Sequence, residues 1–308
     1  MQKKRIVTLT LNPAVDEHYE TCRESDGGLR LVGRDRGGKG INVTRALHNA
    51  GVESICYVVI GERDREEFLS GEDISHLKIH ARTVRGGVRT NRHIHTPSGD
   101  MVESGTSEPL ADADIIAIFS ELDRLVDEGD VLAVCGSAPA GTNTSLITEL
   151  LIEQRKRGVQ IIIDSRTLSL EKLSMIRPIM IKPNAEEAEQ YLGYPLNESN
   201  IYNALGELAA PLGADVLLTL GEDGACLYSG GGIYRARSHS VEVKSTTGAG
   251  DSTVCAYIIG ILRDLCAPDI LRLAVAFGCA ACEMEGSAPP DPCRVKELYE
   301  GITVELVK

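Results

Sequence analysis

The sequence predicts an α/β fold with a mainly parallel central sheet and a small additional β-layer. Three features support this: short apolar β-rich runs recur along the chain, helical patterns separate them, and two polar, glycine-containing segments interrupt the alternation. Strands that alternate with helices favour a parallel sheet covered on both faces, because each crossover between parallel strands needs a helix. With 308 residues, 43% of them hydrophobic, the chain can bury the core of one large domain or of two small ones.

The strands and helices of the main sheet follow from hydrophobic periodicity. β-Branched, apolar runs of strand length cover residues 5–11, 54–60, 131–135, 160–164, 179–182 and 216–220. Apolar residues at three- and four-residue spacing predict helices at 41–50, 112–128, 144–157, 185–192, 201–212, 252–265 and 270–285. Ligands in such folds bind beyond the carboxyl ends of the strands, which is where Ser137, Asp164 and Asn184 fall.

The two interrupting segments, 17–37 and 84–108, alternate as strands do and predict a small β-layer that projects from the main body. Alternate residues of a strand point to one face, so each segment holds a set expected to share a face: Arg30, Val32, Arg34 and Arg36 in the first, and Arg89, Asn91, His93 and His95 in the second. Such a polar face is either solvated or part of a lid that offers donors to an anionic substrate.

The composition excludes several classes of function. A formal net charge of −13 argues against a nucleic-acid or anionic-membrane partner, because both demand clustered basic surface. The apolar stretch at 6–11 is too short and too alternating for a signal peptide, and no run approaches the ~20 apolar residues that span a bilayer. We therefore expect a cytoplasmic protein with no membrane contact.

The nine cysteines are scattered through apolar segments, a usage typical of a reducing compartment. Cys279 and Cys282 have the spacing of metal ligands or of a redox pair, yet they lie within the helical pattern 270–285 and no matching second pair accompanies them. We interpret them as buried helix cysteines.

The most informative motif is the turn Gly248-Ala249-Gly250-Asp251, which precedes a long apolar run. The glycines lack Cβ atoms, so backbone N–H groups can approach an anion closely, and the dipole of the following helix would attract negative charge. Asp251 could cap free N–H groups at the helix start or take the proton from an attacking hydroxyl. The motif alone leaves open a capped turn and a phosphoryl-transfer site.

Taken together, six motifs in order resemble those of the ribokinase-like, or phosphofructokinase B, sugar kinases over essentially the whole chain. They are the Gly-Ala-Gly-Asp turn and the segments 10–16, 37–43, 136–141, 182–187 and 219–225. The resemblance implies a three-layer α/β/α ribokinase-like fold with a β-sheet lid, in a single kinase domain spanning residues 1–308. It also implies an ATP-dependent phosphotransferase and a homodimer formed through the lid.

The resemblance implies a role for each nucleotide-side motif. Asp251 would be the general base, and the N–H groups of Gly248, Ala249 and Gly250 would stabilise the transferring phosphoryl group. ATP would contact Lys182, Asn184, Glu187, Thr219, Gly221 and Gly224. Magnesium would be organised by Asn184 and Glu187 through water, and a monovalent cation could bind around 245–247 and 286–289. Without the resemblance, Asn184 and Glu187 also fit a helix N-cap with Glu at N3, and 219–224 fits a simple hairpin.

The acceptor-side residues implied by the resemblance are Asp16, Gly38, Lys39, Asn42, Arg89, Asn91, His93 and Ser137. Taken alone, Asp16 could instead cap the turn after Pro13, and Lys39 could point to water. Arg89 stands at the arginine position of the phosphosugar branch, and its guanidinium suits a phosphate that a free sugar lacks. Fructose 1-phosphate is the leading acceptor. The alternatives are tagatose 6-phosphate, fructose 6-phosphate, a free sugar or nucleoside, and a non-catalytic sugar-phosphate sensor.

Three segments depart from the family pattern. Residues 61–67 replace a glycine-rich stretch, residues 164–167 lack the expected small residues after Asp164, and Gly28, in a short lid loop at 26–29, stands where some relatives place a lysine. We expect these departures to lie near the acceptor and to leave the nucleotide chemistry unchanged.

Overall fold

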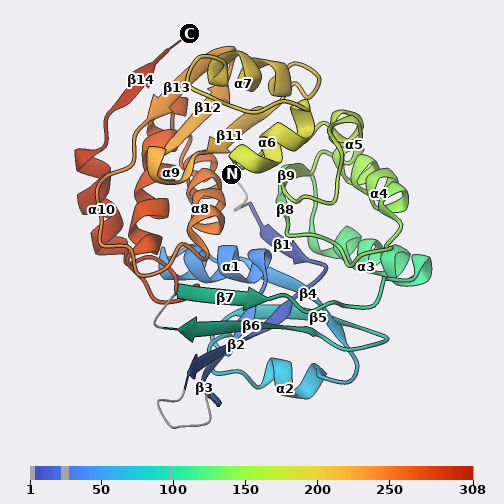
Figure 1. Ribbon diagram of the computed structural model, residues 1–308. Helices are drawn as coiled ribbons and strands as arrows, with labels where there is room; N and C mark the ends of the chain where they lie inside the picture. The colour runs from blue at the N-terminus through green and yellow to red at the C-terminus, as the bar shows by residue number, and fades with distance from the viewer. Residues whose placement is uncertain (1–3, 22–27, 97–98, 308) are drawn as a thin grey trace.

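The computed structural model describes residues 4–21, 28–96 and 99–307, and two sheets organise them (Figure 1). The larger sheet has ten strands in the order β14-β13-β12-β11-β10-β9-β8-β1-β4-β5. Its strands are β1 (Ile6–Thr10), β4 (Ile55–Gly61), β5 (Lys78–Val84), β8 (Val131–Cys135), β9 (Gln160–Asp164), β10 (Met180–Ile181), β11 (Asp215–Thr219), β12 (Ala225–Ser229), β13 (Gly232–Ala236) and β14 (Val304–Leu306).

The larger sheet is parallel from β5 to β11 and antiparallel from β11 to β14. All six strands expected from the sequence are present, with ends displaced by at most one residue. β5 escaped prediction because Lys78, His80 and Arg82 alternate along it, a pattern that suits the edge of a sheet. The mainly parallel sheet is therefore confirmed, with an antiparallel margin added at one side.

Helices cover both faces of the larger sheet. One face carries α3 (Asp112–Leu125), α4 (Thr144–Lys156), α5 (Leu170–Ile176), α6 (Ala185–Leu192) and α7 (Ile201–Ala209); the other carries α1 (Lys39–Asn49), α8 (Ala249–Leu262), α9 (Ala267–Cys282) and α10 (Pro292–Gly301). The short α2 (Arg65–Leu69) packs beside β4. No helix of the described ranges is long and apolar enough to cross a membrane.

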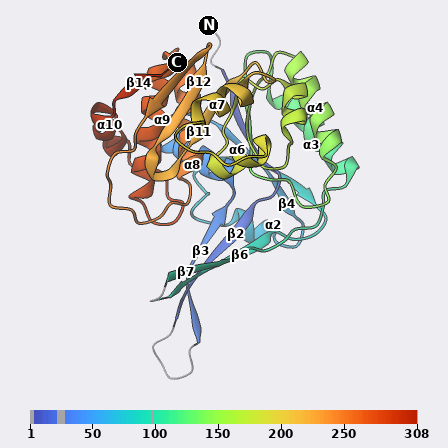
Figure 2. The same cartoon turned by 45° about the horizontal axis from the view of Figure 1, so that its top comes forward.

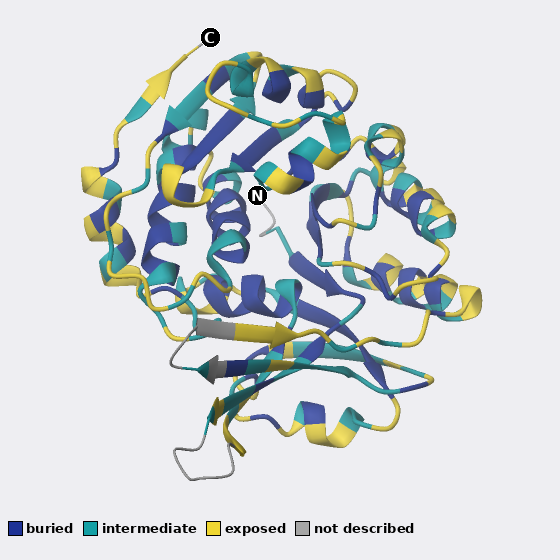
Figure 3. Ribbon diagram, in the orientation of Figure 1, coloured by how far each residue is buried: buried dark blue, intermediate teal, exposed yellow. Residues whose placement is uncertain are grey.

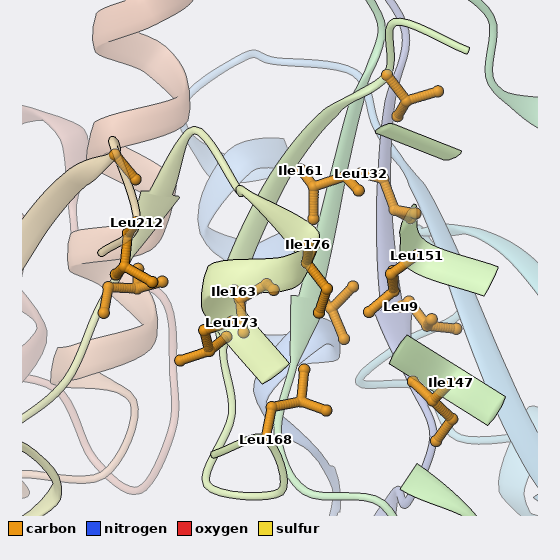
Figure 4. Close-up of a cluster of buried hydrophobic side chains, with 14 of the residues drawn as sticks. Leu9, Leu132, Ile147, Leu151, Ile161, Ile163, Leu168, Leu173, Ile176 and Leu212 are labelled. Atoms are coloured by element: carbon orange, nitrogen blue, oxygen red, sulfur yellow. The ribbon is translucent and has the colours of Figure 1, made fainter. Parts of the chain in front are cut away.

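Strand alternation divides the core into two clusters. On β8, Leu132 and Val134 pack into the cluster beneath α3 to α7, which Figure 4 shows in part, whereas Ala133 and Cys135 pack beneath α1, α8 and α9. Both sets are almost fully buried because neighbouring side chains on a strand point to opposite faces, and each face has helices over it (Figure 3). The three-layer α/β/α arrangement is confirmed.

The smaller sheet is the predicted lid. Its strands β2 (Ala14–Thr21), β3 (Leu29–Gly37), β6 (Arg89–Thr96) and β7 (Gly99–Glu103) pair in the order β3-β2-β6-β7. Figure 2 shows this sheet extending from the main body as an arm. Cys22, residues 26–27 of the lid loop and the side chain of His95 lie outside the described residues.

The prediction that Arg30, Val32, Arg34 and Arg36 share one face of their strand is wrong. A β-bulge opposite His18 and Tyr19 leaves Val32 unpaired, so Arg30 pairs with Glu20 whereas Arg34 pairs with Glu17. Glu17 and Glu20 point to opposite faces of β2, and the bulge therefore separates Arg30 from Arg34. Arg34 lies on the face away from Asp16 and contacts Glu17 at 2.6 Å.

Helix α8 begins at Ala249, three residues earlier than the apolar run suggested. The N-cap residue is Gly248, with a φ of 81° that favours glycine. Asp251 therefore lies within the first helical turn and is not the N-cap, which removes one of the two roles open to it.

Candidate active site

The Gly-Ala-Gly-Asp turn places a buried carboxylate at the N-terminus of α8. Asp251 is 6% exposed, and the amide of Asn42, from the first turn of α1, donates from Nδ2 to Asp251 Oδ2 at 2.8 Å. The N–H group of Ala249 donates to the carbonyl oxygen of Thr246 at 3.3 Å. This hydrogen bond within the turn must break before the N–H group can bind a phosphate. Asp251 thus faces α1 from a helix terminus suited to anions.

A cluster of buried charges surrounds Asp251. Asp164, at the end of β9, is fully buried and pairs with Lys39 Nζ at 2.8 Å and with Lys182 Nζ at 3.4 Å through Oδ1. Asp164 Oδ2 is buried without a hydrogen-bond partner within the described part of the chain. Two lysines therefore share one carboxylate beside the turn, and a Cβ on Gly250 would lie 3.4 Å from Lys182 Nζ.

These surroundings raise the pKa of Asp251 to about 6. Burial is the main cause and the negative charge of Asp164 adds to it, whereas Lys39, the Asn42 amide and Lys182 oppose the shift. Burial lowers the pKa of Lys39, but Asp164 and Asp251 outweigh burial and raise it overall. A carboxyl group with a pKa near 6 can accept a proton close to neutral pH.

The lid residues form a second polar group. Asn91 donates to Asp16 Oδ1 at 2.6 Å, His93 Nε2 lies 3.5 Å from the same oxygen, and Arg89 Nη1 donates to Asn91 Oδ1 at 3.1 Å. Burial lowers the pKa of Arg89, and Asp16 partly opposes that shift. Arg89 Nε is buried without a hydrogen-bond partner in the described residues, which leaves a cationic donor available to an anion. His18 stacks on His93 with ring centroids 4.9 Å apart.

Asn184 and Glu187 form a capping box at the start of α6. Asn184 Oδ1 accepts from the Glu187 N–H at 2.8 Å, and Glu187 Oε2 accepts from the Asn184 N–H at 3.0 Å. Arg166 Nε donates to Glu187 Oε1 at 2.7 Å, so each carboxylate oxygen has a partner. Burial raises the pKa of Glu187, but Arg166, the Asn184 N–H and the two lysines outweigh it and lower the pKa overall. Glu187 is therefore ionised at neutral pH.

The remaining predicted residues lie at strand ends around this cluster. Ser137 follows β8, and the preceding Gly136 abuts the side chain of Lys39. Thr219 ends β11 and bridges to Asn184. Gly221 and Gly224 bound the short turn between β11 and β12, so the hairpin alternative describes the local structure. Gly38 is the N-cap of α1, next to Gly37, where a Cβ would collide with Asp16 Oδ2 at 2.0 Å.

Comparisons with known proteins identify the family. The model of the pfkB family carbohydrate kinases matches residues 7–293. The chain belongs to this family. It is 30% identical to a 1-phosphofructokinase of Rhodobacter capsulatus over 98% of each chain, and 26% identical to a tagatose-6-phosphate kinase of Staphylococcus epidermidis over 97% of this chain and 99% of that one. The crystal structure of phosphofructokinase-2 from Escherichia coli in complex with substrates and products matches with a TM-score of 0.86, at 25% identity over 96% and 99% of the two chains.

This pfkB-family protein is accordingly a carbohydrate kinase, a phosphotransferase that acts on a hydroxyl group, and its ribokinase-like fold is confirmed. Two of the segments that depart from the family pattern can be placed. Residues 164–167 contact both sides of the site: Arg166 donates to Glu187 on the nucleotide side, whereas Asp164 pairs with Lys39 at 2.8 Å and Thr167 Oγ1 accepts from the N–H of Ala138 at 2.8 Å on the acceptor side. Residues 61–67 do lie at the base of the lid, where Asp64 Oδ2 accepts from the N–H of Val88 at 2.7 Å.

Sequence reasoning gave no specific role to two buried charged residues of this kinase. Asp164 carried a signal, a carboxylate at the end of an apolar strand, but nothing in the sequence linked it to two distant lysines. Arg45 carried none, because one arginine on a helix is ordinary, and only packing shows that it is buried beside Asn42.

Proposed function

We propose that this kinase transfers the γ-phosphoryl group of ATP to a hydroxyl group of a sugar phosphate, with fructose 1-phosphate as acceptor and fructose 1,6-bisphosphate as product. The observation that carries the proposal is the pairing of two features: a buried carboxylate at a helix N-terminus, and a half-buried arginine on the lid whose Nε has no hydrogen-bond partner in the described residues. The first suits a base beside a phosphate, and the second suits an acceptor that carries its own phosphate.

In the proposed reaction, the acceptor hydroxyl attacks the γ-phosphorus, the bond from that phosphorus to the ADP oxygen breaks, and the hydroxyl proton passes to Asp251. General-base catalysis of this kind typically contributes about 10²–10⁴-fold. The N–H groups of Gly248, Ala249 and Gly250 would stabilise charge on the transferring group, the contribution that dominates phosphoryl transfer. The ammonium groups of Lys39 and Lys182 pair with Asp164 and add positive charge to the same region.

On the acceptor side, Asp16 would accept hydrogen bonds from sugar hydroxyls while Asn91 and His93 hold its carboxylate in place. Arg89 would bind the acceptor's phosphate through its free donors. Gly38, Asn42 and Ser137 would complete the wall of the acceptor site at the start of α1 and the end of β8. The relatives named for fructose 1-phosphate and for tagatose 6-phosphate support a phosphosugar and leave tagatose 6-phosphate as the closest alternative.

ATP would extend from this turn toward Lys182, Asn184, Glu187, Thr219, Gly221 and Gly224. Magnesium fits the donor set, since Mg²⁺ prefers oxygen ligands and keeps several of its waters. Both carboxylate oxygens of the ionised Glu187 already accept hydrogen bonds, so contact with the ion through a water suits this residue. When bound, the ion would neutralise charge on the phosphates. A monovalent cation near 245–247 and 286–289 is part of the proposal.

The whole chain would act as one kinase domain that dimerises through its lid. Apolar side chains are exposed on the lid strands, where a second copy could cover them: Leu29, Leu31, Val32, Met101 and Val102 are each between 45% and 59% exposed. Apolar surface concentrated on a projecting sheet is a common sign of a protein interface.

The test is ADP release with Mg-ATP across fructose 1-phosphate, tagatose 6-phosphate, fructose 6-phosphate, free fructose, ribose and adenosine, with Asp251→Asn as the control. Stimulation by fructose 1-phosphate above the others supports the proposal. Stimulation by another phosphosugar replaces only the acceptor, whereas stimulation by free sugars or adenosine alone refutes the phosphosugar class. Binding of phosphosugars without any turnover would indicate a sensor.

A further inference from the structure

Arg45 is a buried cation one helical turn beyond Asn42 on α1, and it is only 5% exposed. Helix α1 follows the end of the lid strand β3 and packs against α8, the helix that carries Asp251 (Figure 1). From this position Arg45 Nη1 donates to Asn42 Oδ1 at 3.5 Å and to Ser287 Oγ at 3.4 Å. A Cβ on Gly248 would lie 3.5 Å from Ser287 Cα, so Arg45 also supports the loop behind the catalytic turn.

Asp73 holds Arg45 in place. It lies in the turn that follows α2, and its Oδ2 accepts hydrogen bonds from Arg45 Nη2 and from the backbone N–H of Arg36, the latter at 2.8 Å. The Arg36 guanidinium lies 3.7 Å from Oδ1 of the same carboxylate. A buried guanidinium needs a partner of this kind, because an unpaired buried charge is strongly unfavourable. Asp73 therefore joins the end of lid strand β3 to the middle of α1.

The direction of these hydrogen bonds determines the orientation of the Asn42 amide. A guanidinium can only donate and an ionised carboxylate can only accept, so the amide oxygen must face Arg45 and the amide nitrogen must face Asp251. The observed contacts have this arrangement. The reversed amide would place two donors together at Arg45 and two acceptors together at Asp251. Arg45 thus excludes the reversed orientation.

We propose that Arg45, anchored by Asp73, is a positioning residue that acts through Asn42 to orient the general base Asp251. The inference rests on the proposed role of Asp251 as base. The other charged groups that face Asp251 are Asp164, Lys39 and Lys182, and none of them contacts Arg45. The relay from Asp73 to Asp251 is therefore separate from the lysine cluster and can be perturbed independently.

The kinetic test compares wild type with Arg45→Met, Arg45→Lys and Asp73→Asn. Loss of orientation is expected to lower kcat about 10–100-fold, as small misplacements of catalytic groups do, with the KM for ATP within about twofold of wild type. The acid limb of the pH–rate profile should move to higher pH, because the Asn42 amide lowers the pKa of Asp251. Arg45→Lys, which keeps a donor, should recover part of the rate. Arg82→Met is the matched control. Arg82 lies on edge strand β5, outside the relay, and is also ion-paired, in its case with Glu121 of α3.

A double-mutant cycle with Asn42→Ala separates positioning from a through-space effect of the arginine charge. If Arg45 acts through Asn42, adding Arg45→Met to Asn42→Ala should change neither kcat nor the acid limb further. An additional loss in the double variant, or wild-type kinetics in a folded Arg45→Met, would overturn the proposal.

A second measurement does not depend on turnover. The carboxyl carbon of Asp251 can be titrated by NMR in protein labelled at aspartate, with Asp251→Asn to assign the signal. Its pKa should rise in Arg45→Met and in Asp73→Asn and stay unchanged in Arg82→Met. An unchanged pKa in both site variants would refute the relay. Absence of turnover in wild type with every acceptor would instead count against the proposed function, while this titration still decides the relay.

Discussion

Replacing Asp251 by asparagine is expected to stabilise the fold at neutral pH while removing most of the activity. The native state raises the pKa of Asp251 from its ordinary value of 3.8 to about 6, chiefly by burial. Because Asp251 binds its proton more tightly in the native state than in the unfolded chain, the protein loses stability as pH rises through the window between the two pKa values. The deficit is then constant above about pH 6.

The size of this deficit follows from the shift. About two pKa units at 1.36 kcal/mol each give a cost near 3 kcal/mol for holding the ionised carboxylate in place. Asp251→Asn removes the charge and keeps an oxygen that can accept from the Asn42 amide. We therefore expect a gain of about 3 kcal/mol at about pH 8, about half of that at pH 5, and about a fifth of it at pH 4.

The assay is urea unfolding of wild type and variant at these pH values, read from midpoints at equal slopes, together with kcat measurements at about pH 8. The kcat should fall at least ~10²-fold. Asp215→Asn is the matched control, because burial also raises the pKa of Asp215. Asp215 accepts a hydrogen bond from the hydroxyl of Tyr257 at 2.9 Å, and Tyr257 lies on α8 about two turns beyond the Gly-Ala-Gly-Asp turn. Asp215→Asn should gain stability without losing turnover.

Two results would refute this reasoning. A pH-independent stability difference between Asp251→Asn and wild type would mean that the buried charge is not the origin of the effect. Wild-type turnover in the variant would remove Asp251 from the role of general base, even if the stability change appeared as expected.

Three further predictions concern the rest of the site and the lid. Arg89→Ala should raise the KM for the phosphosugar about 10–100-fold with little change in kcat, since it removes charge-assisted hydrogen bonds to the acceptor's phosphate; an unchanged KM would exclude that contact. Lys39→Met should move the acid limb of the pH–rate profile to higher pH, because the Lys39 charge lowers the pKa of Asp251, and a limb that stayed in place or moved down would contradict this. The double variant Leu31→Lys/Met101→Lys puts charge on the exposed apolar surface of the lid and should therefore sediment as a monomer where wild type sediments as a dimer. A dimer that persisted would point to another interface.

Local residue patterns were sufficient for the main layers but not for details that depend on pairing between strands. Apolar strands that are buried on both faces produce continuous runs, and these located β8 and β9 to the residue. The bulge at Val32 had no sequence signal, because it arises from the way β3 pairs with β2. The true start of α8 at Ala249 also escaped detection, since its first turn holds small and polar residues instead of apolar ones.

The motifs likewise located the ends of the site without its internal connections. Glycines before a helix and an aspartate in its first turn indicate an anion site through local backbone geometry alone, and the resemblance assigned the family that the comparisons confirmed. The pairing of Lys39 with Asp164, 125 positions away, depends on both lying at the same edge of the sheet. The contact from Arg166 to Glu187 is similar: a residue that looked like an acceptor-side departure lies beside the capping box.

The sequence by itself determined the α/β class, the lid, the kinase family and the residue types of the chemistry, because hydrophobic period and turn composition are local properties. Only the tertiary structure decided which charges are buried together and in which direction their hydrogen bonds run. Burial sets the pKa of Asp251, and Asp73 and Arg45 orient the Asn42 amide toward it. Both effects arise where α1, α8, β9 and the base of the lid meet, and no local segment of the chain contains that meeting point.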